Sequence, residues 1–416
     1  MFAKLSGFNS SFGFKLSILA LGSISTMCSG IIVSALPMIQ REFIDLPYAK
    51  LLVRMIITTP HFMVLISAPF MGFLTSKVNR KYLLCGAVVV YGTSGAVCYF
   101  IHSLYVIVAM RMILGLCIAI TLATTSTLIA DCLKGDDRSM ITGLQTTFFS
   151  IGTVIMAGLG GIVADINWHY NFLLYALPTL MVPFAWKYLY EPRNNVEYLQ
   201  YKENESASAI FGVQNNAAIV SIYLIAFINT VFYYMIHLQI PFLLDSMGMN
   251  AKSISMVLMV ETASCAFFAS KYKKWKKNRS FITMCTLAFA VMALSYMIVG
   301  VTGSYYIILG SMVLYGIGMG TMMPNNSLWI TYSIGARNRG LILGGFHSAV
   351  YSGKSLSAII LYPLIKYTSL RLSFVCASFS MIGIAISVLY GSEKINPDTK
   401  DIFDTKDTNS VLDNTD

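Results

Sequence analysis

Residues 105–130 read YVIVAMRMILGLCIAITLATTSTLIA, and Arg111 is the only charged side chain among them. An α-helix needs about 20 largely apolar residues to cross the hydrocarbon core of a bilayer. This run therefore predicts a membrane-spanning helix. Eleven further runs of the same kind follow along the chain, near residues 16–38, 51–74, 83–101, 140–164, 171–190, 217–243, 252–270, 280–300, 305–332, 341–365 and 371–391.

The composition agrees with a chain that lies mostly in lipid. Charged residues make up 12% of its 416 residues and apolar residues 56%, whereas about 25% of residues are charged in typical soluble proteins. A soluble globule of this length would not cover its surface with so few charges. We therefore expect an all-α membrane protein with twelve transmembrane helices.

The net charge of +10 indicates orientation rather than a nucleic-acid partner, because the basic residues lie in short segments between the apolar runs. If the N-terminus is cytoplasmic, the inner segments hold 21 of the 29 Lys and Arg residues, and the outer loops hold five. Cytoplasmic loops are enriched in these residues. Both termini are thus predicted to face the cytoplasm, with the multi-pass chain in the cytoplasmic (inner) membrane of a bacterium.

Two polar segments divide the chain. Residues 191–216 are predicted to form a cytoplasmic linker, and residues 392–416 an acidic, disordered tail. The stretches 1–190 and 217–391 are each predicted to form a bundle of six helices. A shift of 201 residues aligns identical residues of the two bundles, which indicates an internal repeat: Gly115 with Gly316, Ser126 with Ser327, Ile129 with Ile330, Arg138 with Arg339, Gly143 with Gly344 and Gly152 with Gly353.

This organisation resembles that of the major facilitator transporters, in which two pseudo-symmetric six-helix bundles are joined by a central cytoplasmic loop. The segment from Gly72 to Leu84, GFLTSKVNRKYLL, is similar to that family's loop between helices 2 and 3, although Ser76 replaces its usual Asp and Asn79 its second Gly. The resemblance implies a cytoplasmic gate formed by Gly72, Lys77, Arg80, Lys81, Asp131 and Arg138. The alternative is a basic loop that only sets the topology.

Two further motifs resemble the twelve-helix drug:proton antiporter branch of the family. Arg111 and Gly115 match a helix 4 motif whose Arg has been linked to proton transfer. Gly152, Gly160 and Gly161 match part of the antiporters' helix 5 pattern, which here lacks its Gly-Pro pair. The resemblance implies transport by alternating access, with export as the favoured direction.

Of the 19 acidic residues, Glu261 alone lies well inside a predicted span, about 14 Å from the outer end of its helix. A charge at mid-membrane costs roughly 2.5–3.5 kcal/mol, so such a residue usually faces a partner or a watery cavity. We expect Glu261 to carry the coupling proton, with Arg111 and Lys354 as its cationic counterparts. The alternative is a structural ion pair with one of these cations. Both interpretations hold if protonation breaks the pair.

Lys354 belongs to a polar stripe on one helix. His347, Tyr351 and Lys354 are spaced four and three residues apart, so they share one face of the helix. A face that contacts lipid would not carry such side chains. We therefore expect the stripe to face the central cavity.

The candidates for substrate binding lie on this stripe or on the helices that line the cavity in the family: Asn229, Tyr233, His237, Asn325, Asn326, His347 and Tyr351. Because Arg111 and Lys354 outnumber Glu261 within the membrane, the cavity should favour anionic or acceptor-rich solutes. His61 is expected to hydrogen-bond a neighbouring helix, and Arg54 to extend to the outer interface.

We thus expect a proton-coupled secondary transporter of a small organic solute, with export favoured. One alternative is proton-coupled uptake of a small organic anion of the carboxylate or siderophore type. Another is a receptor or scaffold of the same fold that transports nothing. The sequence offers no nucleophile–base pair, Walker loop or metal-ligand cluster. We therefore expect neither an enzyme nor a cofactor, metal or nucleic-acid partner. The expected partners are the solute, protons and lipid, and the chain should be a monomer.

Overall fold

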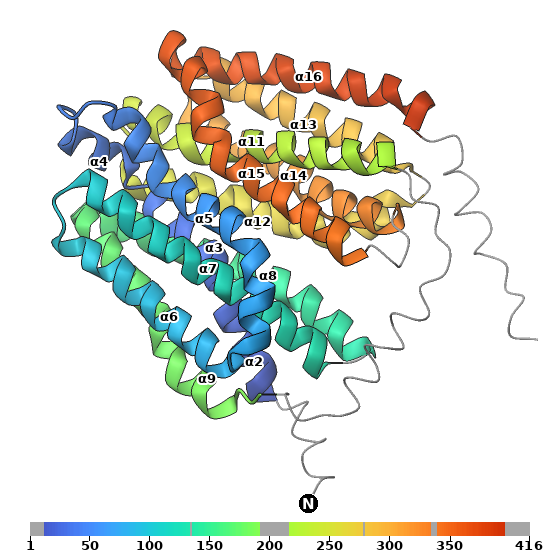
Figure 1. Cartoon of the computed structure of the whole chain (residues 1–416). Helices are drawn as coiled ribbons and strands as arrows, with labels where there is room; N and C mark the ends of the chain where they lie inside the picture. The colour runs from blue at the N-terminus through green and yellow to red at the C-terminus, as the bar shows by residue number, and fades with distance from the viewer. Residues whose placement is uncertain (1–11, 134, 192–215, 278, 334–338, 396–416) are drawn as a thin grey trace, which may run out of the picture.

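The computed structural model describes residues 12–133, 135–191, 216–277, 279–333 and 339–395, and within these ranges it contains helices and no strands (Figure 1). The N-terminal half consists of α2 (Phe12–Gly22), α3 (Ile24–Val33), α4 (Leu36–Glu42), α5 (Ala49–Lys77), α6 (Arg80–Val97), η1 (Cys98–Phe100), α7 (Leu104–Cys132), α8 (Gly135–Ile166), η2 (Trp168–Met181) and α9 (Val182–Tyr188). The C-terminal half consists of α11 (Asn216–Ser246), α12 (Ala251–Lys276), α13 (Phe281–Val301), α14 (Tyr305–Tyr332), α15 (Arg339–Tyr367) and α16 (Leu370–Ile395). Figure 1 shows the two halves as neighbouring groups of helices.

The predicted spans lie almost entirely in helices. In the described part of the chain, nine helices are long and apolar enough to cross a membrane, and α2 with α3, bent by 40° at their break, makes a tenth. The two other predicted spans are helical as well, since residues 171–190 fall largely in η2 and α9 and residues 341–365 in α15. The prediction of an all-α membrane protein is confirmed.

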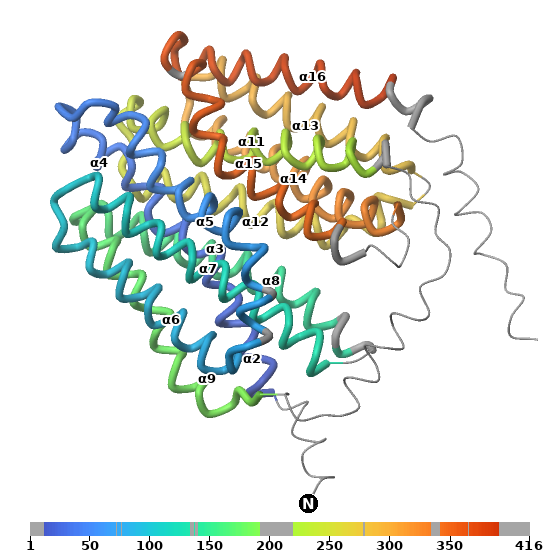
Figure 2. The backbone as a smooth tube through the Cα atoms, viewed as in Figure 1, coloured from blue at the N-terminus to red at the C-terminus, as the bar shows by residue number. Residues whose placement is uncertain are grey.

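Small residues let the two halves approach each other closely. On α8, a Cβ added at Gly161 would lie 2.2 Å from Ser255 Oγ of α12, and one at Gly158 would lie 3.2 Å from Met259 Sδ. Such close backbone approach is typical of helix interfaces in membranes. On the other side of the interface, α5 lies against α11 and α15 (Figure 2). The contact therefore joins α5 and α8 of the N-terminal half to α11, α12 and α15 of the C-terminal half.

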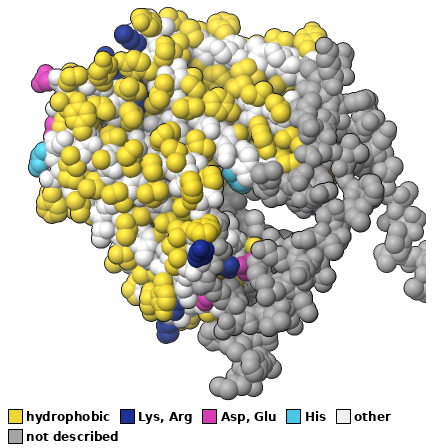
Figure 3. Space-filling view, in the orientation of Figure 1, with side chains coloured by type: hydrophobic (Ala, Val, Ile, Leu, Met, Phe, Trp, Pro, Cys, Tyr) yellow, Lys and Arg dark blue, Asp and Glu magenta, His cyan; other side chains and the backbone are white. Residues whose placement is uncertain are grey.

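The surface fits a lipid environment. Hydrophobic side chains cover most of the described part of the face in Figure 3. Large apolar side chains such as Phe70, Phe379 and Ile359 are 58–67% exposed. Such an exposed apolar surface is far larger than soluble monomers tolerate, and it is suited to contact acyl chains.

The two ends of the bundle are named here by the orientation that the basic residues predict. The outer end contains α4 and the turn between α11 and α12, and the inner end contains the turn between α5 and α6. The predicted linker at 191–216 and the tail at 392–416 lie outside the described residues, except for residues 191, 216 and 392–395.

Candidate transport site

Five polar side chains from three helices meet between the halves, halfway along the bundle. We call them the mid-membrane cluster: His61, Tyr234, His237, Tyr351 and Lys354. The hydroxyl of Tyr234 lies 2.8 Å from Nε2 of His61. The ring of His61 stacks on Tyr351, with centroids 6.1 Å apart, and Tyr234 stacks on His237 at 5.7 Å.

The helices bring these residues to one depth. His61 on α5, Tyr234 on α11 and Lys354 on α15 each lie about 18–20 Å from the outer end of their helix. Because α5 belongs to the N-terminal half and the other two helices to the C-terminal half, the cluster spans the interface. A site between the halves near the midplane is the usual place for substrate in transporters built from repeats.

Lys354 supplies the only formal charge of the cluster when the histidines are neutral. Its Nζ lies 4.9 Å from the ring centroid of Tyr351 and 5.9 Å from that of Tyr234. The side chain is half-buried. No carboxylate of the described residues comes within ion-pair distance of it. The expected ion pair between Glu261 and Lys354 is therefore wrong for this conformation.

Glu261 lies inside the C-terminal half. It is fully buried on α12, and its Oε2 accepts a hydrogen bond of 3.1 Å from Thr262 Oγ1. Its Oε1 has no hydrogen-bond partner within the described residues. Tyr233 and Tyr315 are close enough to interact with it electrostatically. Tyrosines rather than cations thus surround the carboxyl group.

Arg111 lies in the core of the N-terminal half. Its guanidinium carbon is 4.4 Å from the ring centroid of Tyr175 and 5.3 Å from that of Phe172. None of its three side-chain nitrogens has a hydrogen-bond partner in the described structure. The alternative pairing of Arg111 with Glu261 is therefore wrong here as well, because the two side chains face the interiors of different halves.

Three of the predicted binding residues lie within the C-terminal half instead of the cavity. Asn325 is fully buried, accepts a hydrogen bond from Tyr272 at 2.7 Å and donates one to the Phe281 carbonyl at 3.0 Å. Asn326 is 3% exposed and contacts the Cys285 thiol. Asn229 contacts the sulfur of Met319 on α14. The expectation that these amides line the cavity is contradicted: they join helices of one half.

The other predicted binding residues lie at or next to the cluster. Tyr233 contacts both Tyr234 and His237, with centroids 5.7 and 4.7 Å apart. His347, four residues before Tyr351 on the stripe of α15, is exposed. Tyr351 and Lys354 face α5 and α11. That the stripe lines a central cavity stays a prediction.

Two further predictions concern α5. His61 hydrogen-bonds Tyr234 of another helix, as predicted. Arg54 does not extend to the outer interface: it is 3% exposed, donates to the Lys50 carbonyl at 2.7 Å and lies 4.3 Å from the ring centroid of Phe242 on α11. The ring of Phe242, across the interface, thus interacts with the Arg54 guanidinium group in place of water.

Within the predicted cytoplasmic gate, Arg80 and Asp131 form an ion pair between α6 and the end of α7. The backbone N–H of Arg80 also donates to the carboxylate of Glu191. Lys77 and Lys81 lie over the rings of Phe73 and Trp186. All these contacts stay within the N-terminal half. The surroundings of Gly72 and the side chain of Arg138 lie outside the described residues.

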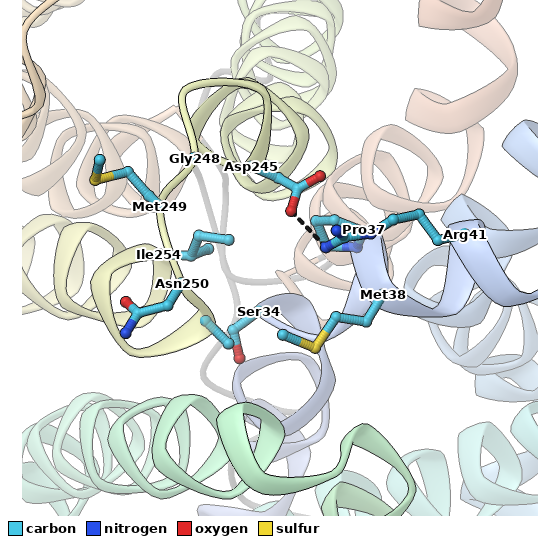
Figure 4. Close-up of a pocket in the computed structure, with 10 residues that line it drawn as sticks. Ser34, Pro37, Met38, Arg41, Asp245, Gly248, Met249, Asn250 and Ile254 are labelled. Carbon is cyan, nitrogen blue, oxygen red and sulfur yellow. Dashed lines mark hydrogen bonds and ion pairs between the residues drawn. The ribbon is translucent and has the colours of Figure 1, made fainter.

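The outer end is closed by polar contacts between the halves that the sequence analysis did not predict. Arg41 of α4 pairs with Asp245 of α11 at 2.6 Å, across the halves (Figure 4). The pair borders a pocket of about 190 Å³ that Ser34 and Asn250 also line. Asp165 accepts hydrogen bonds from the backbone N–H groups of Ala251 and Lys252 at 2.7 and 3.2 Å. A carboxylate is favoured at a helix N-terminus such as that of α12.

Some residues of these sites do have a weak signal in the sequence. Tyr234 lies three residues before the predicted binding residue His237, so these two side chains lie on the same side of α11. Asp165 and Asp245 lie near ends of predicted spans, where a carboxylate usually faces water. Their partners on the other half are far away in sequence, so only the fold reveals them.

Comparison with known proteins agrees with this architecture. Residues 18–358 match the Major Facilitator Superfamily. The chain is 23% identical over 393 residues to the Bacillibactin exporter of Bacillus subtilis, covering 90% of this chain and 96% of that protein. It is also 23% identical to the Quinolone resistance protein NorA of Staphylococcus aureus, over only 25% of this chain and 26% of that protein.

Solved structures give the same fold. The xylose transporter XylE from E. coli, in a partially occluded inward open conformation, superimposes with a TM-score of 0.75 at 13% identity, covering 94% of this chain and 98% of that one. A point mutant of the nucleoside transporter NupG superimposes with a TM-score of 0.74 at 11% identity, covering 91% and 99%. The chain belongs to the Major Facilitator Superfamily of membrane transporters.

Proposed function

We propose that this chain is a proton-coupled exporter of small organic anions that binds its substrate at the mid-membrane cluster. The observation that carries the proposal is the position of Lys354. It places one cation, surrounded by hydroxyl and imidazole groups, at the contact between the two halves. A site there is exposed to one side of the membrane and then to the other as the halves rock.

The chemistry of the cluster favours an anion. A carboxylate or phenolate would neutralise the ammonium group of Lys354 and accept hydrogen bonds from Tyr234 or Tyr351. The aromatic rings of the cluster would contact the apolar part of the same solute. Glu261 does not compete for Lys354, because it lies inside the C-terminal half.

Export is supported by the relative that matches over nearly the whole chain, since the B. subtilis protein is an exporter of bacillibactin. We propose a single chain as the functional unit, because each half already supplies helices to the site.

Glu261 is the proposed carrier of the coupling proton. An ionised carboxylate without a partner is costly at this depth, and protonation removes that cost. Tyr233 connects the two sites, because it interacts with Glu261 and its ring contacts Tyr234 and His237. A change of charge at Glu261 would therefore alter the electrostatic potential at the mid-membrane cluster.

Flux in everted vesicles tests the proposal. Metabolites of cells and medium from a deletion strain would first identify the solute, which should accumulate inside the mutant cells. Everted vesicles that contain the protein should then take up that solute when a proton gradient is imposed, and an uncoupler should stop the uptake. Accumulation by right-side-out vesicles alone would contradict export.

A second candidate is proton-coupled uptake of an organic anion. The proximity of His61 to Lys354 favours it, because a protonated imidazole would attract the same anion and make proton and solute bind together. In that case lowering the pH tightens solute binding to the purified protein. For an exporter driven by proton entry, lowering the pH instead weakens solute binding.

A further inference from the structure

The inner end of α12 carries a dense group of positive charges. Residues 271–279 contain five Lys and one Arg and no acidic residue. Five of these cations are exposed, and we call them the basic end of α12: Lys271, Lys273, Lys274, Lys277 and Arg279. Within the described residues, no carboxylate lies within ion-pair distance of any of the five.

Packing within the C-terminal half fixes the backbone at this end. Tyr272 is buried, and its hydroxyl donates to Asn325 of α14 at 2.7 Å. Lys276 donates to the Arg279 carbonyl and lies over the ring of Phe281, with its Nζ 3.8 Å from the centroid. The chain therefore turns directly from α12 into α13, and the exposed cations stay together at one place.

The contacts of the helix itself leave these charges unbalanced. The helix dipole favours cations in the last turn, but Lys277 and Arg279 lie past the end of α12. Across the interface, α8 packs along α12. Asp137 near the inner end of α8 already pairs with Lys15 of its own half at 3.0 Å. The basic end thus remains available to a further acidic partner.

The sequence that follows α16 has the opposite charge. Residues 396–416, which lie outside the described residues, contain six Asp and two Lys, a net charge of −4. Four of these Asp residues recur at every third position: Asp398, Asp401, Asp404 and Asp407. We call residues 398–407 the acidic segment. It matches the basic end of α12 in length and is complementary to it in charge.

The direction of α16 brings this sequence to the correct end of the bundle. α16 lies beside α13 (Figure 1). The rings of Phe374 and Tyr296 have centroids 5.2 Å apart, and four residues later Ser378 donates to the Ala293 carbonyl at 2.7 Å. The residue numbers rise along α16 as they fall along α13, so the two helices are antiparallel.

The same register shows that the acidic segment can reach the basic end. At the same rise per residue in both helices, Tyr390 of α16 lies level with Phe281, where α13 begins. α12 ends five residues before Phe281. A flexible chain of nine residues, the separation of Asp404 from Ile395, spans about 15–18 Å. Such a short tether gives an effective concentration of about millimolar or more.

We propose that the acidic segment docks on the basic end of α12. Single exposed ion pairs are weak, so the docking depends on several pairs acting together and on the tether. The docked segment covers cations that would otherwise attract the headgroups of anionic lipids. Both partners belong to the C-terminal half, and the inference therefore does not depend on the proposed function.

Photo-crosslinking of the full-length chain tests the docking. The chain is placed in nanodiscs that hold one chain each, made of phosphatidylcholine and phosphatidylglycerol. Phe403→p-benzoylphenylalanine puts a photoreactive group into the acidic segment without changing its charge, and mass spectrometry maps the crosslinked residues. We expect crosslinks within residues 267–281. Raising NaCl from about 0.1 M to about 1 M shortens the Debye length from about 10 Å to about 3 Å and should lower their yield by about fivefold or more.

Charge variants separate docking from mere proximity. The first replaces all four Asp residues of the acidic segment by Asn, and the second replaces three exposed lysines of the basic end: Lys273→Gln, Lys274→Gln and Lys277→Gln. Each should lower the yield about as much as high salt does, because each removes one side of the attraction. Lys400→Gln with Lys406→Gln makes the segment more negative and should keep the yield at least as high.

Three results would overturn the proposal. The first is crosslinking that is equally frequent around Lys77 and Lys187, which are exposed lysines at the inner end of the N-terminal half. The second is a yield that neither the Asp nor the Lys replacements change. The third is crosslinking that occurs in phosphatidylcholine alone but disappears with phosphatidylglycerol, because lipid headgroups would then occupy the basic end of α12.

Discussion

Glu261 and the mid-membrane cluster lie at comparable depths, yet their surroundings differ. Glu261 is sealed within the C-terminal half, hydrogen-bonded to its neighbour Thr262 and surrounded by tyrosines. The cluster joins helices of both halves, and its charged member Lys354 keeps part of its surface exposed. Only the cluster changes its contacts when the halves move as rigid bodies.

This difference suggests a division of roles. A group with all its contacts in one half can store a proton, but it needs an intermediary to influence the gate. A group at the interface responds directly to the movement of the halves and to a bound solute. Tyr233 is the structural connection between the two sites. The predictions that follow separate the roles by altering one site at a time.

The largest effect is expected for Lys354→Met. With solute bound, Lys354 would be enclosed in an ion pair, and removing one partner of such a pair costs about 2–5 kcal/mol, so affinity for the anionic solute should fall by about 30-fold or more. Equilibrium binding to the purified protein measures it. Lys366→Met, an exposed position on the same helix, is the matched control and should bind normally. A Lys354→Met protein that binds normally would place the substrate elsewhere.

Glu261→Gln should give the next largest effect. The amide imitates the protonated carboxyl group, so flux driven by a proton gradient should fall by about tenfold, within the range of typical coupling energies. Solute–solute exchange needs no net proton movement and should persist. Asp45→Asn removes an exposed carboxylate and should leave both rates unchanged. Loss of exchange together with driven flux would instead indicate a structural role for Glu261.

A smaller effect is expected at the inner end. The side chains of Arg80 and Asp131 are only 13% and 10% exposed, so breaking this pair should matter more than breaking a surface pair. Asp131→Asn should lower the melting temperature by about 2–4 °C. A double-mutant cycle with Arg80→Gln measures the coupling. Additive losses from the two substitutions would show that the pair contributes nothing.

The smallest effect should follow Arg41→Ala at the outer end. The Arg41 side chain is 62% exposed, and exposed pairs contribute about 0–1 kcal/mol. Labelling of a Ser34→Cys variant, at a position 1% exposed in the outer pocket, with a membrane-impermeant maleimide should therefore rise by about twofold or less when Arg41→Ala is added. The carboxylate of Asp165 and the close contact of α8 with α12 would still hold the outer end. A rise of about tenfold or more, which is about 1.4 kcal/mol, would make Arg41 the principal seal.

The fold could be predicted from the sequence because lipid imposes a simple pattern. Long apolar runs with few charges must be helices, since no other element satisfies its backbone hydrogen bonds alone within a bilayer, apart from closed barrels. The sequence also predicts that Tyr351 and Lys354 lie on one face of their helix, because residues three and four apart share a face.

The partners of the buried residues could not be predicted in the same way. Sequence spacing shows which face of a helix is polar, but not which other helix that face meets. Glu261 and Arg111 were expected to meet because both are buried charges, and each instead faces the interior of its own half. Asn325 and Asn326 likewise satisfy neighbouring helices.

Tyr234 shows the opposite case, in which the fold adds a functional residue. Nothing in the local sequence distinguishes it from Tyr233, since both are tyrosines next to each other on α11. Their different directions decide their roles: Tyr234 contacts His61 of the other half, and Tyr233 lies towards Glu261. Only the packing of α5 against α11 separates them.

A structure of the full chain with its transported solute bound would test the central claim most directly. We predict that the solute lies between the halves, with an anionic group in contact with Lys354 Nζ and its apolar part against the rings of His61, Tyr234 or Tyr351. A solute held beside Glu261 inside the C-terminal half, with Lys354 out of contact, would contradict the account.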